Sequence, residues 1–208
     1  MSAGGDTGAP TGRLIALEGT GGRAMAVAAR RLERSFRPAQ AAAGVSGWDA
    51  SAIFLEIAQG PRAIPAPPPQ TLILLYAADL AFRLRWQIRP ALEEGTHVIA
   101  APYLETVIGF GRASGLSQAW LRRAFAFAPP PDICYRVPES TIQMNRRATP
   151  SDSFIEFCFA HLRNGPAFWD IEEIRRGFVA HLDRLESSGK CSLVTRHTPD
   201  AVPSARSF

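Results

Sequence analysis

Lysine is nearly absent from this sequence of 208 residues. Lys190 is the only lysine among 23 basic residues, so the other 22 are arginines. An arginine bias that accompanies abundant Ala, Gly and Pro is typical of a GC-rich genome, and this is the simplest interpretation. The formal net charge of +4 also suits an anionic partner. Because the arginines are scattered rather than grouped in blocks, binding of nucleic acid or another anionic polymer is the weakest of the functional hypotheses.

Cysteines and long apolar runs are also scarce. The three cysteines, Cys134, Cys158 and Cys191, are widely spaced and odd in number, which argues against a disulfide framework or a zinc site and favours a reducing cytoplasm. No apolar run is long and uniform enough to predict a membrane span. The first dozen residues lack the apolar core of a secretory signal. No histidine, cysteine or carboxylate grouping predicts a metal site.

Short apolar runs alternate with segments of helical periodicity. Strands are predicted by the runs at 13–17, 43–46, 97–101, 133–137 and 191–195. Helices are predicted at 24–36, 50–59, 70–89, 104–112, 117–127, 138–147, 151–162 and 171–186. This alternation indicates a three-layer α/β/α fold with a mostly parallel five-stranded sheet. We expect one domain over 13–197, with flexible tails at 1–12 and 198–208.

The predicted helix over 70–89 is apolar nearly all round. Pro90 follows it and is expected to end it. A helix of this kind lies either at the centre of a domain or in a subunit interface.

The turn after the first predicted strand stands where a phosphate-binding loop belongs. A P-loop, G-x-x-x-x-G-K-[ST], cradles phosphate with backbone N–H groups, pairs its lysine with the β- and γ-phosphates, and holds Mg²⁺ with its hydroxyl. The chain here reads Gly19, Thr20, Gly21, Gly22, Arg23, Ala24, Met25 and Ala26. Ala24 therefore replaces the second glycine, Met25 the lysine and Ala26 the hydroxyl residue. Only weak anion binding by the helix N-terminus remains as an expectation.

Arg23 is the candidate replacement for the missing lysine. It stands two positions early and has a different geometry from lysine. A solvated loop arginine is therefore the simpler interpretation.

Four stretches, in order, resemble the thymidylate kinase family of P-loop nucleoside monophosphate kinases. Leu14–Gly19 is similar to the family's first strand and the start of its P-loop, and 74–79 to its Leu-Leu-Phe-x-Ala-Asp-Arg helix. Residues 88–99 are similar to the approach to the strand that carries Asp-Arg-Tyr, and 131–138 to the Pro-Asp-x-x-x-x-Leu-Asp-Val-Pro strand. The resemblance covers about residues 13–196 and implies the P-loop NTPase fold.

Most functional positions of that family are changed here. No counterpart of the Arg-Glu-Pro motif of the acceptor phosphate site is found between 39 and 69. The remaining changes are Gly21 for an acidic loop residue, Leu80 for a base-contacting arginine, Ala101 and Pro102 for Asp-Arg, and Arg136 for the aspartate of Leu-Asp-Val-Pro.

Some positions still match the family pattern by residue type. Tyr76, Asp79 and Tyr103 are the acceptor-pocket candidates that the resemblance implies, although a core aromatic and structural hydrogen bonds are the simpler interpretations. Arg146 and Arg147 are lid candidates, with a solvated helix end as the simpler interpretation.

The sequence therefore predicts a thymidylate-kinase-like pseudoenzyme with no catalytic residue. It would bind either a protein partner or a nucleotide without turnover. The alternative is an active nucleoside monophosphate kinase with a dTMP-like acceptor and relocated catalytic groups, and only this alternative implies ATP and Mg²⁺ as cofactors. We also expect a homodimer through the helix 70–89, because the resembled family commonly pairs through this region.

Overall fold

The computed structural model describes residues 12–60, 67–138, 153–163 and 169–194. Within these ranges, five strands form one sheet in the order β2-β3-β1-β4-β5, and every neighbouring pair is parallel. The strands are β1 (Leu14–Glu18), β2 (Ala43–Gly47), β3 (His97–Ala101), β4 (Ile133–Arg136) and β5 (Ser192–Leu193). Each overlaps a run that predicted a strand, so the predicted parallel five-stranded sheet is confirmed.

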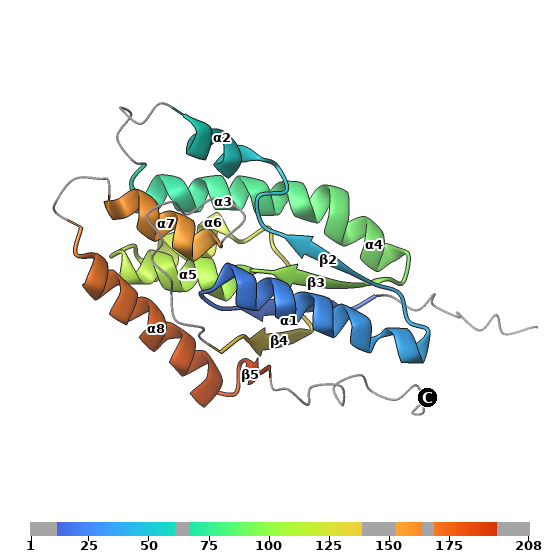
Figure 1. The fold of residues 1–208 in the computed structure, drawn as a ribbon. Coiled ribbons are helices and arrows are strands. Elements are labelled where there is room, and N and C mark those ends of the chain that lie inside the picture. The colour runs from blue at the N-terminus through green and yellow to red at the C-terminus, as the bar shows by residue number, and fades with distance from the viewer. Residues whose placement is uncertain (1–11, 61–66, 139–152, 164–168, 195–208) are drawn as a thin grey trace, which may run out of the picture.

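Helices cover both faces of this sheet (Figure 1), which confirms the predicted α/β architecture. They are α1 (Gly22–Ser35), α2 (Ile53–Gln59), α3 (Pro69–Arg83), α4 (Arg89–Glu93), α5 (Leu104–Ala113), α6 (Gln118–Ala124), α7 (Phe154–Arg163) and α8 (Ile171–Ser187). Among the described residues, none of these helices has the length and apolar character needed to cross a bilayer. Beyond Pro138, the predicted helix over 138–147 lies outside the described residues, as do the predicted tails apart from Gly12.

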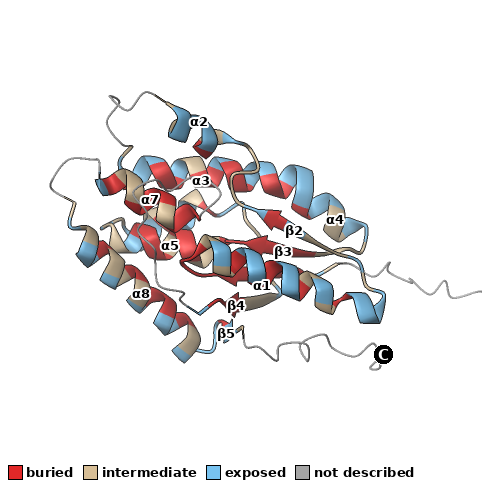
Figure 2. Cartoon of the chain, viewed as in Figure 1, coloured by how far each residue is buried: buried red, intermediate tan, exposed pale blue. Residues whose placement is uncertain are grey.

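The two faces of the sheet carry separate apolar clusters, because successive strand residues point to opposite faces. Leu17 and Ile99 belong to the cluster that α1 covers. Ala16 and Val98 belong to the larger cluster, which includes residues of α3, α5, α7 and α8. In Figure 2 the buried, red parts of the central strands lie between these helical layers, and the outer helix faces are largely pale blue.

The predicted helix over 70–89 continues further than its sequence suggests. α3 is followed by a π-helical turn, Leu84–Ile88, in which the N–H of Arg89 donates to the carbonyl of Leu84. α4 then contains Pro90 in its first turn. Proline is tolerated there because an N–H in the first turn has no partner within its own helix. The expectation that Pro90 ends the helix is therefore wrong.

Two of the three cysteines form a disulfide, contrary to the expectation from their number and spacing. Cys134 and Cys191 are joined, with their Cα atoms 4.6 Å apart. The pairing follows from the sheet register, because β4 and β5 are neighbours with Tyr135 opposite Ser192. Cys158 is a buried free thiol. The expectation of a reducing compartment, which rested on unpaired cysteines, loses that support.

Candidate functional site

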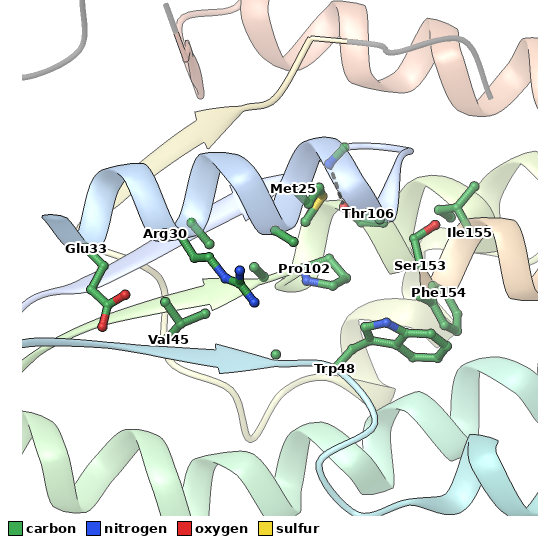
Figure 3. A pocket seen from close by; sticks show the side chains of 16 residues that line it. Met25, Arg30, Glu33, Val45, Trp48, Pro102, Thr106, Ser153, Phe154 and Ile155 are labelled. Carbon is green, nitrogen blue, oxygen red and sulfur yellow. Dashed lines mark hydrogen bonds between the residues drawn. The ribbon is translucent and has the colours of Figure 1, made fainter. Parts of the chain in front are cut away.

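The loop between β1 and α1 borders a cavity of about 370 Å³ (Figure 3). Its walls come from α1, from β2 and the residue after it, from the end of β3 and the segment into α5, and from the start of α7. The lining residues are Gly19, Gly22, Met25, Ala26, Ala29, Arg30, Glu33, Val45, Gly47, Trp48, Ala101, Pro102, Thr106, Ser153, Phe154 and Ile155. Ligands of open α/β sheets bind beyond the carboxyl ends of the strands, so this cavity is the candidate site.

Glu18, the last residue of β1, is hydrogen-bonded to the start of α5. It is fully buried and accepts hydrogen bonds from the N–H groups of Glu105 and Thr106 at 3.0 and 2.9 Å and from the Thr106 hydroxyl at 2.6 Å. Burial raises the pKa of Glu18 to about 7, although the hydrogen bonds from Thr106 and Glu105 act in the opposite direction. Glu18 therefore caps a helix under the cavity and lies away from its lining.

The backbone of the loop is bonded to the rest of the chain. The N–H of Gly19 donates to the Thr106 hydroxyl oxygen at 3.1 Å, and the N–H of Gly22 donates to a carboxylate oxygen of Glu156 at 3.3 Å. The Ser153 hydroxyl donates to the carbonyl of Thr20 at 2.7 Å. In a P-loop, such N–H groups and the helix N-terminus face phosphate. Here a carboxylate of the same chain stands at the N-terminus of α1.

Met25 stands at the position of the P-loop lysine, and it is a core residue. Its side chain is buried and belongs to the cluster between α1 and the sheet. A Cβ placed on Gly19 would lie 3.3 Å from the Met25 sulfur, which shows how closely this side chain packs on the loop. Ala26, at the hydroxyl position, lines the cavity with no polar group. The apolar side chains thus extend into the region where a kinase needs a cation and a metal ligand.

The arginine that lines this cavity is Arg30, and the sequence analysis did not single it out. Arg23 is exposed and is not among the lining residues. A signal was available, since Ala26, Ala29, Arg30 and Glu33 share one face of a helix by their spacing of three and four. Which face of α1 meets the cavity depends on how the helix packs on the sheet, and spacing alone does not determine that.

The acceptor-pocket candidate Tyr76 lies in the core beneath this region. It is fully buried, and its hydroxyl donates to the carbonyls of Pro102 and Tyr103, at 2.9 and 2.7 Å. Burial raises the pKa of Tyr76 and likewise that of Tyr103. The Tyr103 hydroxyl donates to the carbonyl of Pro129 at 2.7 Å. Neither tyrosine lines the cavity, and an acceptor role for them stays a prediction.

Asp79, the third acceptor candidate, organises the segment after β2. Its carboxylate accepts from the N–H groups of Asp49 and Ser51 at 3.0 and 2.9 Å, and from the Ser51 hydroxyl at 2.9 Å. It is fully buried and does not line the cavity. Any contact between Asp79 and an acceptor stays a prediction.

Arg83 is a fully buried guanidinium that sequence reasoning missed. It donates from Nη2 to the carbonyl of Ser46 at 2.6 Å, from Nε to the Ser46 hydroxyl at 3.0 Å, and from Nη1 to the carbonyl of Pro102 at 3.1 Å. Within the described ranges, no carboxylate forms an ion pair with it. Arg83 therefore joins α3 to β2 and to the residue after β3, directly behind the cavity wall.

Several thymidylate kinases match parts of the chain. The "Probable thymidylate kinase" of Pyrococcus abyssi is 37% identical over 84 residues, which are 40% of this chain and 41% of that protein. That of Thermococcus gammatolerans is 31% identical over 135 residues, 56% of this chain and 65% of that protein. The thymidylate kinase of Thermomicrobium roseum is 35% identical over 86 residues, 38% and 41% of the two chains. No protein-family model matches the chain.

The chain is related to the thymidylate kinases. The P-loop kinase-like fold and the sequence similarity agree on this. The match spans about 41% of the length of the first of these relatives. It therefore supports a relationship to these proteins and their fold, while activity and substrate need separate arguments.

Arg136 departs from the thymidylate kinase pattern, and its contacts explain the change. It stands where that pattern has an aspartate, and it forms ion pairs with Asp183 at 2.8 Å and Glu186 at 2.6 Å, both on α8. The carboxylates thus come from α8, and Arg136 ties β4 to that helix. The lid candidates Arg146 and Arg147 lie outside the described residues.

A second cavity, of about 420 Å³, lies between α5, α6 and α8. Within it Glu105 pairs with His181 at 3.1 Å and with Lys190. Burial raises the pKa of Glu105, but the hydrogen bonds and charges of His181 and Lys190 outweigh burial and leave this pKa below its usual value. Arg112, Arg122 and Arg184 also line the cavity, so its wall is basic. Among the described residues, no group of three His, Cys, Asp or Glu side chains is arranged to hold a metal ion.

Proposed function

We propose that this relative of the thymidylate kinases does not transfer phosphoryl groups and acts by binding another molecule. The observation that carries the proposal is the contact between Gly22 and Glu156. A carboxylate of the chain already stands at the N-terminus of α1, at 3.3 Å from the first N–H of the helix. A phosphate there would meet a like charge, which destabilises binding instead of supporting it.

The side chains around this contact support the same conclusion. Met25 is buried in the core, and Ala26, Ala101 and Pro102 line the cavity without a charged or metal-binding group. Losing one preorganised electrostatic donor typically lowers an enzyme's rate by about 10²–10³-fold. Losses at the lysine, the metal ligand and the Asp-Arg positions do not simply add, but together they remove the groups at the family's own positions and leave Arg30 as the one cation among the described lining residues.

A coupled assay with ATP, Mg²⁺ and a panel of nucleoside monophosphates, including dTMP, tests the proposal. Kinases turn over at roughly 1–100 s⁻¹, and we expect no turnover above background. Turnover within a few orders of magnitude of ordinary kinases that Arg23→Ala abolishes would instead support the active-kinase alternative with a relocated cation. Arg31→Ala is the matched control, because Arg31 is an exposed arginine of the same helix that does not line the cavity.

Of the two binding roles, a protein partner has the stronger support. Leu74, Phe82 and Trp86 are 49%, 39% and 62% exposed, although they are large and apolar. Their spacing of eight and then four residues along α3 and the π turn puts them near one face. Exposed apolar side chains that gather on one face mark protein interfaces. A nucleotide, in contrast, would have to displace Glu156 from the loop.

We propose that this face pairs with a second copy of the chain. Light scattering is expected to show a dimer that Trp86→Glu converts to a monomer. Val27→Glu is the control, because Val27 is 57% exposed on α1, away from α3. A strictly monomeric protein at high concentration would remove the homodimer and leave a different protein as the partner.

A further inference from the structure

The cavity beside the loop is apolar inside. Met25, Ala29, Trp48, Pro102 and Phe154 supply much of its wall, and the Trp48 and Phe154 rings pack edge-on at 5.8 Å between centroids. Its volume of about 370 Å³ falls near the lower end of the roughly 300–1,000 Å³ typical of ligand pockets. The space therefore suits a small ligand with an apolar body.

The hydroxyl groups in the wall are already bonded. The Thr106 hydroxyl donates to Glu18 and accepts from the N–H of Gly19. The Ser153 hydroxyl donates to the carbonyl of Thr20 and accepts from the N–H of Glu156. Neither hydroxyl is thus free to orient a polar ligand, and the specific polar contact has to come from another lining residue.

Arg30 is that residue. Figure 3 shows its side chain reaching from α1 toward β2, with the guanidinium over the space between Val45 and Pro102. Among the described residues, its guanidinium has no hydrogen bond and no ion pair, including with Glu33 one turn further along α1. A guanidinium is a planar fork that binds carboxylates through two parallel hydrogen bonds. Next to an apolar wall, that attraction is stronger than in bulk water.

We propose that the cavity binds an organic monocarboxylate with an aromatic or alkyl body. The apolar body lies among Met25, Ala29 and Phe154, and the carboxylate binds Arg30 at the opening. A polyphosphate does not suit this site, because Arg30 is the one cation among the described lining residues and Glu33 would repel further negative charge. The inference rests on the proposed loss of phosphoryl transfer, since a kinase would need the same space for its reacting phosphates.

The first test compares three ligands of one shape by isothermal titration calorimetry. The probes are 1-naphthoate, neutral 1-naphthylmethanol and cationic 1-naphthylmethylamine. We expect saturable binding of 1-naphthoate, weaker binding of the alcohol and none of the amine. Arg30→Gln should weaken naphthoate binding roughly tenfold or more, as the loss of a charge-assisted hydrogen bond implies, and leave the alcohol unchanged. Arg31→Gln, the matched control on the same helix, should change neither.

The second test fills the cavity. Ala26 is exposed and lines the space, so Ala26→Leu should weaken naphthoate and the alcohol alike without lowering the melting temperature. Val27→Leu is its neighbour outside the lining residues and should have no effect. Undiminished binding in the folded Ala26→Leu variant would show that the ligand lies elsewhere and would overturn the inference.

Two further outcomes also overturn it. One is the absence of saturable naphthoate binding up to about 1 mM, the limit of weak specific binding. The other is displacement of naphthoate by ATP or dTMP at micromolar concentration. The coupled kinase assay separates the two proposals: no turnover with no naphthoate binding removes this inference alone, whereas turnover removes the proposed function first.

Discussion

The two cavities described above differ in charge, and the basic one is not the one beside the β1–α1 loop, where a kinase would need cations. The cavity beside the β1–α1 loop is mostly apolar, and a carboxylate stands at the adjacent helix N-terminus. The cavity between α5, α6 and α8, away from that loop, is basic. The β1–α1 loop lies where a P-loop fold binds phosphate, while Met25 and Ala26 stand at the positions of the P-loop lysine and hydroxyl residue. Position in a fold therefore does not establish function, and the residues do.

The cavities also differ in how their surroundings are held. Glu18 and Arg83 behind the first cavity are fully buried and bonded to backbone groups. Lys190 beside the second is 58% exposed and pairs with a carboxylate that is 13% exposed. Buried polar groups cost more to disrupt than exposed ion pairs. Substitutions of the buried groups are therefore expected to have larger effects than substitutions in the exposed ion pairs.

The largest effect is expected for Arg83→Ala. The substitution removes three hydrogen bonds to Ser46 and Pro102 and opens a cavity, although the Pro102 carbonyl still accepts from the Tyr76 hydroxyl. We expect the free energy of unfolding to fall by about 3–5 kcal/mol in urea titrations. Arg85→Ala, at an exposed position two residues along, should change it by no more than about 0.5 kcal/mol. A loss below about 1 kcal/mol for Arg83→Ala would show that the network behind the cavity is not needed.

The next effect is a pH dependence that Glu18 produces. Its pKa is about 7 in the folded chain against 4.5 for the free group, so between these values the folded state holds a proton that the unfolded state has lost. The unfolding free energy should therefore fall as pH rises from about 4.5 to 7, by on the order of 3 kcal/mol. Glu18→Gln should remove that part of the slope, and unfolding curves across this range measure it. An unchanged slope would mean that Glu18 is not buried in this way.

Glu105, in the basic cavity, should act in the opposite direction and more weakly. Its pKa is held below its usual value by His181 and Lys190 despite burial, so its stabilising contribution is present above the unfolded pKa and is lost as pH falls. Glu105→Gln should lower the unfolding free energy at pH 7 by about 1 kcal/mol and flatten its decline in acid. Arg112→Gln, which leaves this pair intact, serves as the control. A greater effect of Glu105→Gln in acid than at pH 7 would contradict the assigned sign.

The smallest effect concerns the anion at the loop. Glu156→Gln keeps an acceptor for the Gly22 N–H and removes the negative charge. A charge at a helix N-terminus is worth about 0.3–1 kcal/mol, so inorganic pyrophosphate should bind the variant about two- to fivefold more tightly than the wild type in calorimetric titrations. Glu172→Gln, at an exposed site on α8, should leave pyrophosphate binding unchanged. Weaker pyrophosphate binding to Glu156→Gln would place the anion site elsewhere.

The sequence predicted the sheet because its evidence is local. Each strand is a short apolar run between turn residues, and even the weak run near 43–46 became β2. The disulfide could not be predicted, because Cys134 and Cys191 are 57 residues apart and meet only through the register of β4 and β5. The prediction that Pro90 ends the helix was wrong because the preceding turn is π-helical, and the place of such a turn decides whether the helix can continue through a proline.

The site was only partly predictable, for the same reason. The replacements at Met25 and Ala26 are visible in the sequence because the family pattern defines those positions. The role of Glu18 depends on Thr106, 88 residues away, and that of Glu156 on Gly22, 134 residues away. Side chains that change a site's charge from distant segments leave no local pattern. Only the packed structure brings them together.

Titration of MgATP into the wild-type chain by calorimetry tests the central claim most directly. With Glu156 at the loop and Met25 in the lysine position, the account predicts no saturable binding up to about 1 mM ATP. Saturable binding with a micromolar dissociation constant would show that the loop still accepts phosphates, and it would contradict the account.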